Sequence, residues 1–315
     1  MKIQKNAPTV FSAATVSAEI AKTVLIDAGN TRIKFAVLLS PSRLDLSDGF
    51  RVFGQCDTNA SVAEIVYLLQ NELGLSSTPE SHAAALVAQT PVKIRACGVC
   101  VAGTPVAQRI NEALRTLDAD AQINWLNGMT PLTGLGNAYA TPETLGADRW
   151  LAAYGLSKVA GEHACVLATF GTATTIDLLH WDTVNKRHVF AGGLIIAGLH
   201  TALRSVSTST AQLPDLHTAD LQKTIAGIAG SHKQDASSEQ GAFVVPNNTQ
   251  DALLIGALLS QAGAVLRFEA LVSQNEREIR TFIAGGAAPL MKDLIPNAQL
   301  LKYPVFVGLS HFSFA

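Results

Sequence analysis

The sequence predicts an α/β protein that is built from two related halves. Residues 24–38 run from an apolar segment through a Gly-Asn-Thr turn into a second apolar segment, and residues 166–179 repeat this order around a Gly-Thr turn. Strand and helix patterns alternate after each of these hairpins, which is typical of α/β domains. With 315 residues, the chain is long enough for two domains and a sizeable core.

The first half is predicted to begin with the hairpin at 24–39. The segment before it is too polar for a signal peptide and is interpreted as a loose extension. A helix is predicted at 61–73, because Val62, Ile65 and Leu69 share one face. The pattern further predicts a loop at 76–81, a strand at 92–101, a helix at 104–117 and a strand at 122–126.

The second half is predicted to follow a linking helix, which starts near Pro142 and continues over 145–159. Residues 231–240 are polar and are interpreted as a flexible insertion. An Asn-Asn-Thr cluster at 247–249 predicts the N-terminus of a helix at 250–265. The other predicted elements are a hairpin at 165–180, a strand at 188–190, an apolar segment at 194–196 with a helix to 206, and a strand at 281–284 before a Gly-Gly turn.

Composition argues against several functional classes. The net charge of -2 disfavours non-specific binding to nucleic acid, and no apolar run reaches the roughly 18 residues of a membrane span. Four cysteines indicate no disulfide framework, so a cytoplasmic protein is expected. Cys97 and Cys100 have C-x-x-C spacing but lack the second ligand pair of a structural zinc site, and they are interpreted as part of a buried strand.

The first turn has the composition of a phosphate-binding loop. Glycine, asparagine and threonine offer backbone N–H groups and hydroxyls at close approach, and two such turns facing across a cleft would hold a nucleotide tail. Asp27 ends the preceding strand, where a carboxylate is well placed to hold hydrated Mg²⁺. Strand alternation puts Lys34 on the same face as Arg32, from where it would neutralise phosphate charge. The alternative is an ordinary polar hairpin turn.

Two further segments carry candidate chemistry. The Gly-Thr-Ala-Thr-Thr run at 171–175 opens the second half, and this position favours phosphate binding over a plain threonine-rich strand. Asp148 and Arg149 lie at a helix start between the halves. An aspartate that accepts the proton of an attacking hydroxyl recurs in kinases, and the arginine would bind a carboxylate. The alternative is that Asp148 only stabilises the helix N-terminus.

The order of these segments resembles the type III pantothenate kinase family, which includes the Bvg accessory factor relatives. Residues 27–34 resemble its D-x-G-N-T-x-x-K signature, residues 145–149 resemble its G-A-D-R motif, and residues 171–175 resemble its second phosphate motif. The resemblance covers residues 24–290.

The resemblance implies a fold and an activity. The fold would be two actin-like ATPase domains, ribonuclease H-like in architecture, at 22–145 and 146–315, which flank a nucleotide cleft. The protein would be a cytoplasmic homodimer that uses ATP and Mg²⁺ to phosphorylate pantothenate to 4'-phosphopantothenate, the first step of coenzyme A biosynthesis.

The resemblance also implies roles for single residues. Asp148 would be the general base, and Asp27 would hold Mg²⁺ through water. The implied ATP-binding residues are Asp27, Ala28, Gly29, Asn30, Thr31, Arg32, Ile33, Lys34 and Thr172. The implied pantothenate-binding residues are Tyr139, Gly146, Ala147, Asp148, Arg149 and Thr249, of which Thr249 would lie near the dimer interface.

One residue departs from the family pattern at the position that usually binds a monovalent cation. Thr169 stands where the family usually has an aspartate that binds a monovalent cation, and a neutral hydroxyl is a poorer ligand for K⁺ or NH₄⁺. Two other functions stay open on the same scaffold: a kinase for another small hydroxyl substrate, and a non-catalytic accessory or regulatory protein. The intact acidic and basic residues of the motifs favour an enzyme.

Overall fold

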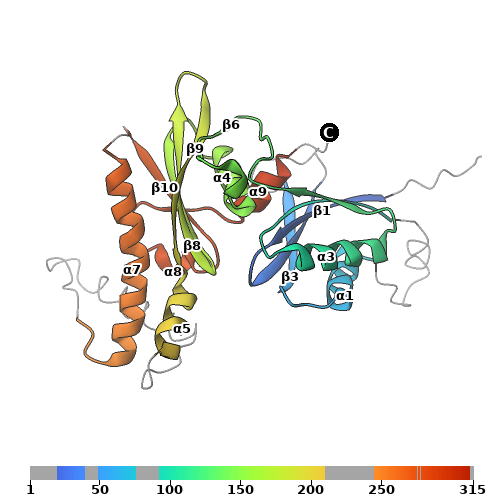
Figure 1. The fold of residues 1–315 in the computed structure, drawn as a ribbon, viewed down its shortest axis with the longest axis horizontal. Helices are drawn as coiled ribbons and strands as arrows, with labels where there is room; N and C mark the ends of the chain where they lie inside the picture. Colours follow the sequence, from blue (N-terminus) through green and yellow to red (C-terminus); the bar gives the residue numbers. More distant parts are fainter. Residues whose placement is uncertain are drawn as a thin grey trace, which may run out of the picture.

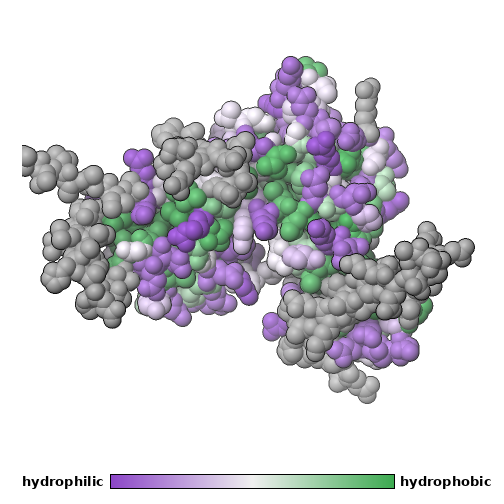
Figure 2. All heavy atoms as spheres, turned by 180° about the vertical axis from the view of Figure 1, so that it is seen from behind, coloured by the Kyte–Doolittle hydropathy of each residue, from purple (hydrophilic) through white to green (hydrophobic). Residues whose placement is uncertain are grey.

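The computed structural model of the protein describes residues 20–39, 49–75, 92–209 and 245–312, apart from 275 and 277. Its elements form two lobes that lie side by side along the longest axis of the molecule, each with one sheet (Figure 1). Helices α4 (Ala147–Ser157) and α9 (Pro304–Ser310) lie between the two sheets. Seen from behind, the lobes are separated by a notch at the lower edge of the view (Figure 2).

The first lobe contains a five-stranded mixed sheet with the order β3-β2-β1-β4-β5. The β1–β2 and β2–β3 pairs are antiparallel, whereas the β1–β4 and β4–β5 pairs are parallel. Two helices cover one face of this sheet, where their apolar sides pack on β1 and β4. The elements are β1 (Ile20–Ala28), β2 (Arg32–Leu38), β3 (Phe50–Asp57), α1 (Val62–Leu73), β4 (Val92–Cys100), α3 (Thr104–Leu117) and β5 (Gln122–Leu126).

The second lobe contains a six-stranded sheet with the order β11-β10-β7-β8-β9-β6. Helices α5, α7 and α8 cover its outer face through a core that includes Leu203, Leu258 and Met291. The elements are β6 (Leu135–Asn137), η2 (Pro142–Thr144), β7 (Ala164–Phe170), β8 (Ala173–Asp182), β9 (Arg187–Ala197), α5 (Leu199–Ser209), α7 (Thr249–Val272), β10 (Ile279–Ala284), α8 (Ala288–Met291) and β11 (Gln299–Leu300).

The two sheets share one topology, which confirms that the protein is an internal duplication with an α/β fold. Strands β9-β8-β7-β10-β11 repeat the order β3-β2-β1-β4-β5 of the first lobe. The directions agree as well, because β7–β8 and β8–β9 are antiparallel while β7–β10 and β10–β11 are parallel. Strand β6 is an addition to the outer edge of β9. The repeated order agrees with the two related halves that the sequence predicts.

Local sequence signals explain the ends of several helices. Ser61 and Glu64 form a reciprocal capping box at the start of α1, and Gly74 ends that helix in the left-handed conformation with φ 71°. The side chain of Asn248 accepts a hydrogen bond from the backbone N–H of Asp251, so the predicted N-terminus of α7 is confirmed. The predicted helix at 104–117 and both hairpins are also confirmed.

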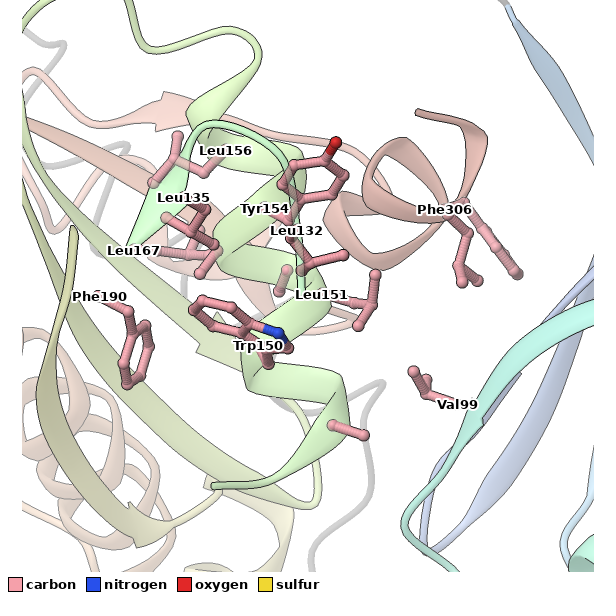
Figure 3. Packing of buried hydrophobic residues seen from close by; sticks show 14 of the residues in the cluster. Val99, Leu132, Leu135, Trp150, Leu151, Tyr154, Leu156, Leu167, Phe190 and Phe306 are labelled. Atoms are coloured by element: carbon pink, nitrogen blue, oxygen red, sulfur yellow. The ribbon is translucent and has the colours of Figure 1, made fainter. Parts of the chain in front are cut away.

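A shared core joins the lobes around α4. Figure 3 shows Trp150 and Leu151 of α4 between Phe190 on the second sheet and Val99 on the first, with Phe306 of α9 nearby. Helices α4 and α9 approach each other closely. A Cβ atom on Gly155 would lie 2.0 Å from the carbonyl oxygen of Pro304, so a side chain cannot be accommodated there. The lobes are therefore held together by a buried apolar layer at one end of their interface.

The linking helix differs from its prediction. Residues 142–144 form the separate 3₁₀ turn η2, and the chain is extended at Leu145 and at the N-cap Gly146 before α4 begins. The sequence patterns also did not predict β3, β6, α8, β11 and α9. The β3 strand contains half-buried and exposed residues and no fully buried one, so its apolar pattern is weak. The extension before residue 20, the loop at 76–81 and the insertion at 231–240 lie outside the described residues.

Helix α7 has an unusual composition. It extends to Val272, beyond the predicted end, and it is long and apolar enough to pass a test for a membrane span. A single helix of this kind is weak evidence for a span, because helices of soluble proteins pass the same test. One side of α7 is fully buried against the second sheet at Leu254, Leu258 and Val265. Its other side leaves Leu259, Leu266 and Leu271 40–45% exposed.

Candidate active site

The first phosphate-type turn, residues 29–31, lies at the end of the β1–β2 hairpin. Asp27 and Lys34 are direct partners across this hairpin, and Lys34 Nζ lies 3.0 Å from Asp27 Oδ2. The Asp27 carboxylate is nearly buried, whereas the Lys34 side chain is 38% exposed. This ion pair therefore places one acidic and one basic side chain next to the turn.

The second phosphate-type turn meets the first one directly. The hydroxyl oxygens of Thr31 and Thr172 are 2.7 Å apart and share a hydrogen bond, although the two residues are 141 positions apart in the chain. Both side chains are exposed. The fold thus brings the two turns together at the junction of the lobes.

Asp148 lies in the first turn of α4, between the two sheets. One of its carboxylate oxygens accepts a hydrogen bond from the backbone N–H of Arg149 at 2.8 Å. Burial raises the pKa of the Asp148 carboxyl, and the nearby negative charge of Asp27 raises it further. Two carboxylates from different lobes therefore lie within electrostatic reach of each other beside the turns.

Arg149 is engaged within the protein. Its guanidinium is 7% exposed and donates hydrogen bonds to Asp177, with Nε at 3.1 Å from Oδ1. It also lies 5.7 Å from the centre of the Tyr139 ring and 5.5 Å from that of Phe190. Burial raises the pKa of Asp177 to about 6, while the Arg149 guanidinium opposes this change by stabilising the carboxylate.

Asp177 is a residue of this cluster that the sequence motifs did not identify as the partner of Arg149. The available signal was a charged residue in the otherwise apolar strand β8. Its cross-strand partner is Gly193, where a Cβ atom would lie 2.6 Å from Asp177 Oδ1. The absence of a side chain at Gly193 therefore leaves room for the ion pair of Asp177 and Arg149.

Tyr139, Gly146 and Ala147 lie close to this cluster. Tyr139 packs on Phe190, with 5.9 Å between the ring centres, and contacts Arg149. Gly146 and Ala147 immediately precede Asp148 at the start of α4. Thr249 is an exposed residue at the start of α7, at the end of that helix next to α5 and away from α4 (Figure 1). A single chain therefore does not bring Thr249 to the other predicted residues.

Thr169 lies at the end of β7 and is half-buried. It pairs with Thr175 of β8 on one side and with Ala284 of β10 on the other. Within the described part of the chain, no group of three or more His, Cys, Asp or Glu side chains could hold a metal ion. Asp27 still suits Mg²⁺, because this ion usually takes one or two carboxylates together with phosphate oxygens and water.

The C-x-x-C pair has no ligand geometry. Cys97 is buried in β4, Cys100 is half-buried at its end, and both are free thiols. Burial raises the pKa of the Cys97 thiol to about 12, which disfavours the thiolate that a metal needs. The interpretation of this segment as a buried strand is confirmed.

Comparisons with known proteins show the family to which this chain belongs. A family model described as type III pantothenate kinase matches residues 23–270. A protein of Aromatoleum aromaticum named type III pantothenate kinase is 30% identical over 273 residues, which cover 86% of this chain and 89% of that protein. One from Burkholderia cenocepacia with the same name is 34% identical over 267 residues, or 84% of each protein. Among solved structures, the pCBH ParM non-polymerisable quadruple mutant has a TM-score of 0.43 at 15% identity and covers 92% of this chain and 98% of that chain.

Proposed function

This chain belongs to the type III pantothenate kinase family and is an ATP-dependent kinase, and we propose that its reaction is the phosphorylation of pantothenate to 4'-phosphopantothenate. The observation that carries the proposal is the meeting of the two threonine turns beside the carboxylates of Asp27 and Asp148. Phosphates held between the turns would lie next to a base that can accept a hydroxyl proton.

The first step is nucleotide binding between the lobes. The turns at 29–31 and 171–172 would hold the phosphate oxygens of ATP through backbone N–H groups and through the hydroxyls of Thr31 and Thr172. Their mutual hydrogen bond would then be exchanged for bonds to phosphate. Lys34 would offset phosphate charge, and Asp27 would hold Mg²⁺ through water.

The second step is transfer of the phosphoryl group. Asp148 would accept the proton of the pantothenate 4'-hydroxyl while that oxygen forms a bond to the γ-phosphorus, and ADP would leave with the electrons of the broken P–O bond. Tyr139, Gly146, Ala147 and Arg149 would line the acceptor side. Because Arg149 is already paired with Asp177, only its remaining donors would be free to bind the pantothenate carboxylate.

The direct test is ADP release measured with a coupled assay, with and without pantothenate. We expect pantothenate-dependent ADP release, together with a product of the mass of phosphopantothenate. ADP release that requires a different small alcohol would identify another acceptor. Absence of any acceptor-dependent turnover, with nucleotide still bound, would favour the accessory or regulatory alternative.

We also propose that the protein acts as a cytoplasmic homodimer. The exposed leucines on the outer side of α7 form an apolar face, and Thr249 lies at the start of the same helix. A second copy packed against α7 would bury this face. It would also bring Thr249 towards the substrate site of the second copy, since Thr249 does not reach the site of its own chain. The division of the chain into domains at residue 145 stays a prediction.

Asp27→Asn is predicted to raise the Mg²⁺ concentration needed for half-maximal activity, because the variant loses an anionic partner of the hydrated ion. A Mg²⁺ titration of initial rates measures this change. Asp120→Asn serves as the control, since Asp120 is an exposed carboxylate of the first lobe bonded to Lys93. If Asp27→Asn titrates like the wild type with full activity, Asp27 is only a strand-end residue.

The enzyme is predicted to depend weakly on K⁺ or NH₄⁺, because Thr169 offers no carboxylate. Asp177 is the nearest acidic residue of the same hairpin, and its carboxylate is occupied by Arg149. Rates measured in Tris buffer with Na⁺, K⁺ or NH₄⁺ as the added cation test this. Thr169→Asp is expected to create or strengthen a K⁺ response. Many-fold activation of the wild type by K⁺ over Na⁺ would contradict the prediction.

A further inference from the structure

The first phosphate turn is held from behind by Thr58, the residue that follows β3. The backbone N–H of Thr58 donates a hydrogen bond to the carbonyl oxygen of Thr31 at 3.1 Å. The hydroxyl of Thr58 donates a second one to the carbonyl oxygen of Gly29, also at 3.1 Å. The carbonyl of Thr58 in turn accepts a hydrogen bond from the Arg109 guanidinium of α3. Thr58 is 8% exposed, so these bonds are formed away from solvent.

The second phosphate turn is held in a similar way. The backbone N–H of Gly198, the residue that follows β9, donates to the carbonyl oxygen of Thr172 at 3.1 Å. The hydroxyl of Thr201 in α5 donates to the same oxygen at 2.7 Å. Strands β3 and β9 are equivalent in the duplicated topology. Both lobes therefore use one backbone N–H and one threonine hydroxyl as donors to turn carbonyls. In the first lobe one residue bonds two carbonyls, and in the second two residues bond one carbonyl.

These bonds determine where the turns direct their free donors. A trans peptide is planar, so its C=O and N–H groups point in opposite directions. Fixing the carbonyl of Gly29 towards Thr58 therefore directs the N–H of Asn30 to the opposite side of the turn. Fixing the carbonyl of Thr172 holds that residue in place, with its hydroxyl facing Thr31 of the other lobe. The donors are thus oriented before a ligand arrives.

We propose that Thr58 and Thr201 are positioning residues for the nucleotide phosphates, although neither is expected to touch the nucleotide. This inference rests on the nucleotide site of the proposed function. Each hydroxyl helps to orient one of the two turns. Loss of either hydroxyl weakens the hold on a turn carbonyl, which can then turn more readily towards the cleft, where it repels phosphate oxygens. The effect falls on nucleotide binding and leaves recognition of the acceptor unchanged.

The test is calorimetric titration with the magnesium complex of AMP-PNP, a nonhydrolysable analogue of ATP. Thr58→Val and Thr201→Val remove the hydroxyl and keep the shape of the side chain. Each is expected to weaken binding by about 3- to 10-fold, the effect of losing one hydrogen bond. Thr58→Ser and Thr201→Ser keep the hydroxyl and are expected to restore most of the affinity. In steady-state assays, the KM for MgATP should rise while the KM for pantothenate stays at the wild-type value.

Thr208→Val and Thr116→Val are the matched controls. Both hydroxyls donate to backbone carbonyls, that of Thr208 at 2.8 Å within α5 and that of Thr116 at 2.9 Å within α3, and both side chains are exposed. They are expected to bind the analogue like the wild type. If the buried Thr58→Val does not fold, the exposed Thr201 position decides the question.

Wild-type affinity in Thr201→Val and in folded Thr58→Val would overturn the inference, as would a loss that serine does not restore. The outcome is separable from the proposed reaction. Weakened analogue binding in the valine variants supports the positioning role even if pantothenate proves not to be the acceptor.

Discussion

Asp148→Asn is expected to lower turnover by roughly 10²–10⁴-fold, the usual contribution of a general base. Asparagine keeps the shape of the side chain and can still accept the hydrogen bond from the backbone N–H of Arg149, but it cannot take the hydroxyl proton. Binding of MgAMP-PNP should be largely retained, because Asp148 is not placed in either phosphate turn. Steady-state rates and a calorimetric titration measure the two effects separately.

Glu143→Gln is the control for this substitution. Glu143 is an exposed carboxylate in the short η2 turn that precedes α4, and its loss is expected to leave turnover unchanged. Near-normal turnover in Asp148→Asn would contradict the assignment of the base.

The pH dependence of kcat/KM gives a second test of Asp148. Burial and the charge of Asp27 raise the pKa of this carboxyl, so the ionised base is lost as pH falls through a pKa higher than the ordinary value of an aspartate. The acidic limb of kcat/KM should therefore lie at a higher pH than an aspartate with the ordinary pKa would give. Asp27→Asn removes one of the two causes, and the limb should then move to lower pH. An unchanged limb would show that another group controls it.

Asp177→Ala is expected to lower the free energy of unfolding by about 3–5 kcal/mol, because it leaves the buried Arg149 guanidinium without its carboxylate partner. Both side chains are nearly inaccessible, at 7% and 2% exposure, so solvent cannot replace the lost partner. Denaturant unfolding monitored by fluorescence of the buried Trp150 measures the change. Activity should also fall, because Arg149 loses its fixed position beside Tyr139.

Two companion variants separate this effect from general damage. Asp120→Ala also removes a carboxylate bonded to a cation, but its side chain is 81% exposed, and a change of about 1 kcal/mol or less is expected. The double variant Asp177→Leu with Arg149→Met should recover much of the lost stability, because an apolar pair avoids the unpaired charge. A loss below about 1 kcal/mol in Asp177→Ala would contradict the role of the ion pair.

Much of the fold was predictable from local patterns. Alternating apolar residues and short Gly-Thr turns are local signals, and they predicted both hairpins and the duplication. The capping residues Ser61 and Asn248 lie beside the helices that they begin, so the starts of α1 and α7 were predictable as well. The pattern failed at the start of α4, where an extended Leu145 and Gly146 interrupt a run that reads as helical. It also failed for β3, an edge strand with little buried surface.

The candidate site likewise contains features that the sequence predicts and contacts that only the structure shows. Asp27, Thr31 and Lys34 lie close together in the sequence, and strand alternation was enough to predict that they share one hairpin. Asp148 could be proposed as the base from its motif, but its pKa depends on burial and on Asp27 of the other lobe. The partner of Arg149 could not be inferred, because Asp177 is 28 residues away and only the packing of α4 on the second sheet brings them together.

The sequence by itself determined that this protein is a duplicated α/β chain with two phosphate-type turns and the motifs of the type III pantothenate kinases. Each of these features can be recognised from residues that are close together in the chain. Only the tertiary structure decided that Thr31 meets Thr172, that Asp177 holds Arg149, and that Thr58 and Thr201 support the turns from behind. The physical reason is that these contacts depend on how two sheets pack around α4 and α9, and packing joins residues whose separation in the chain carries no periodic signal.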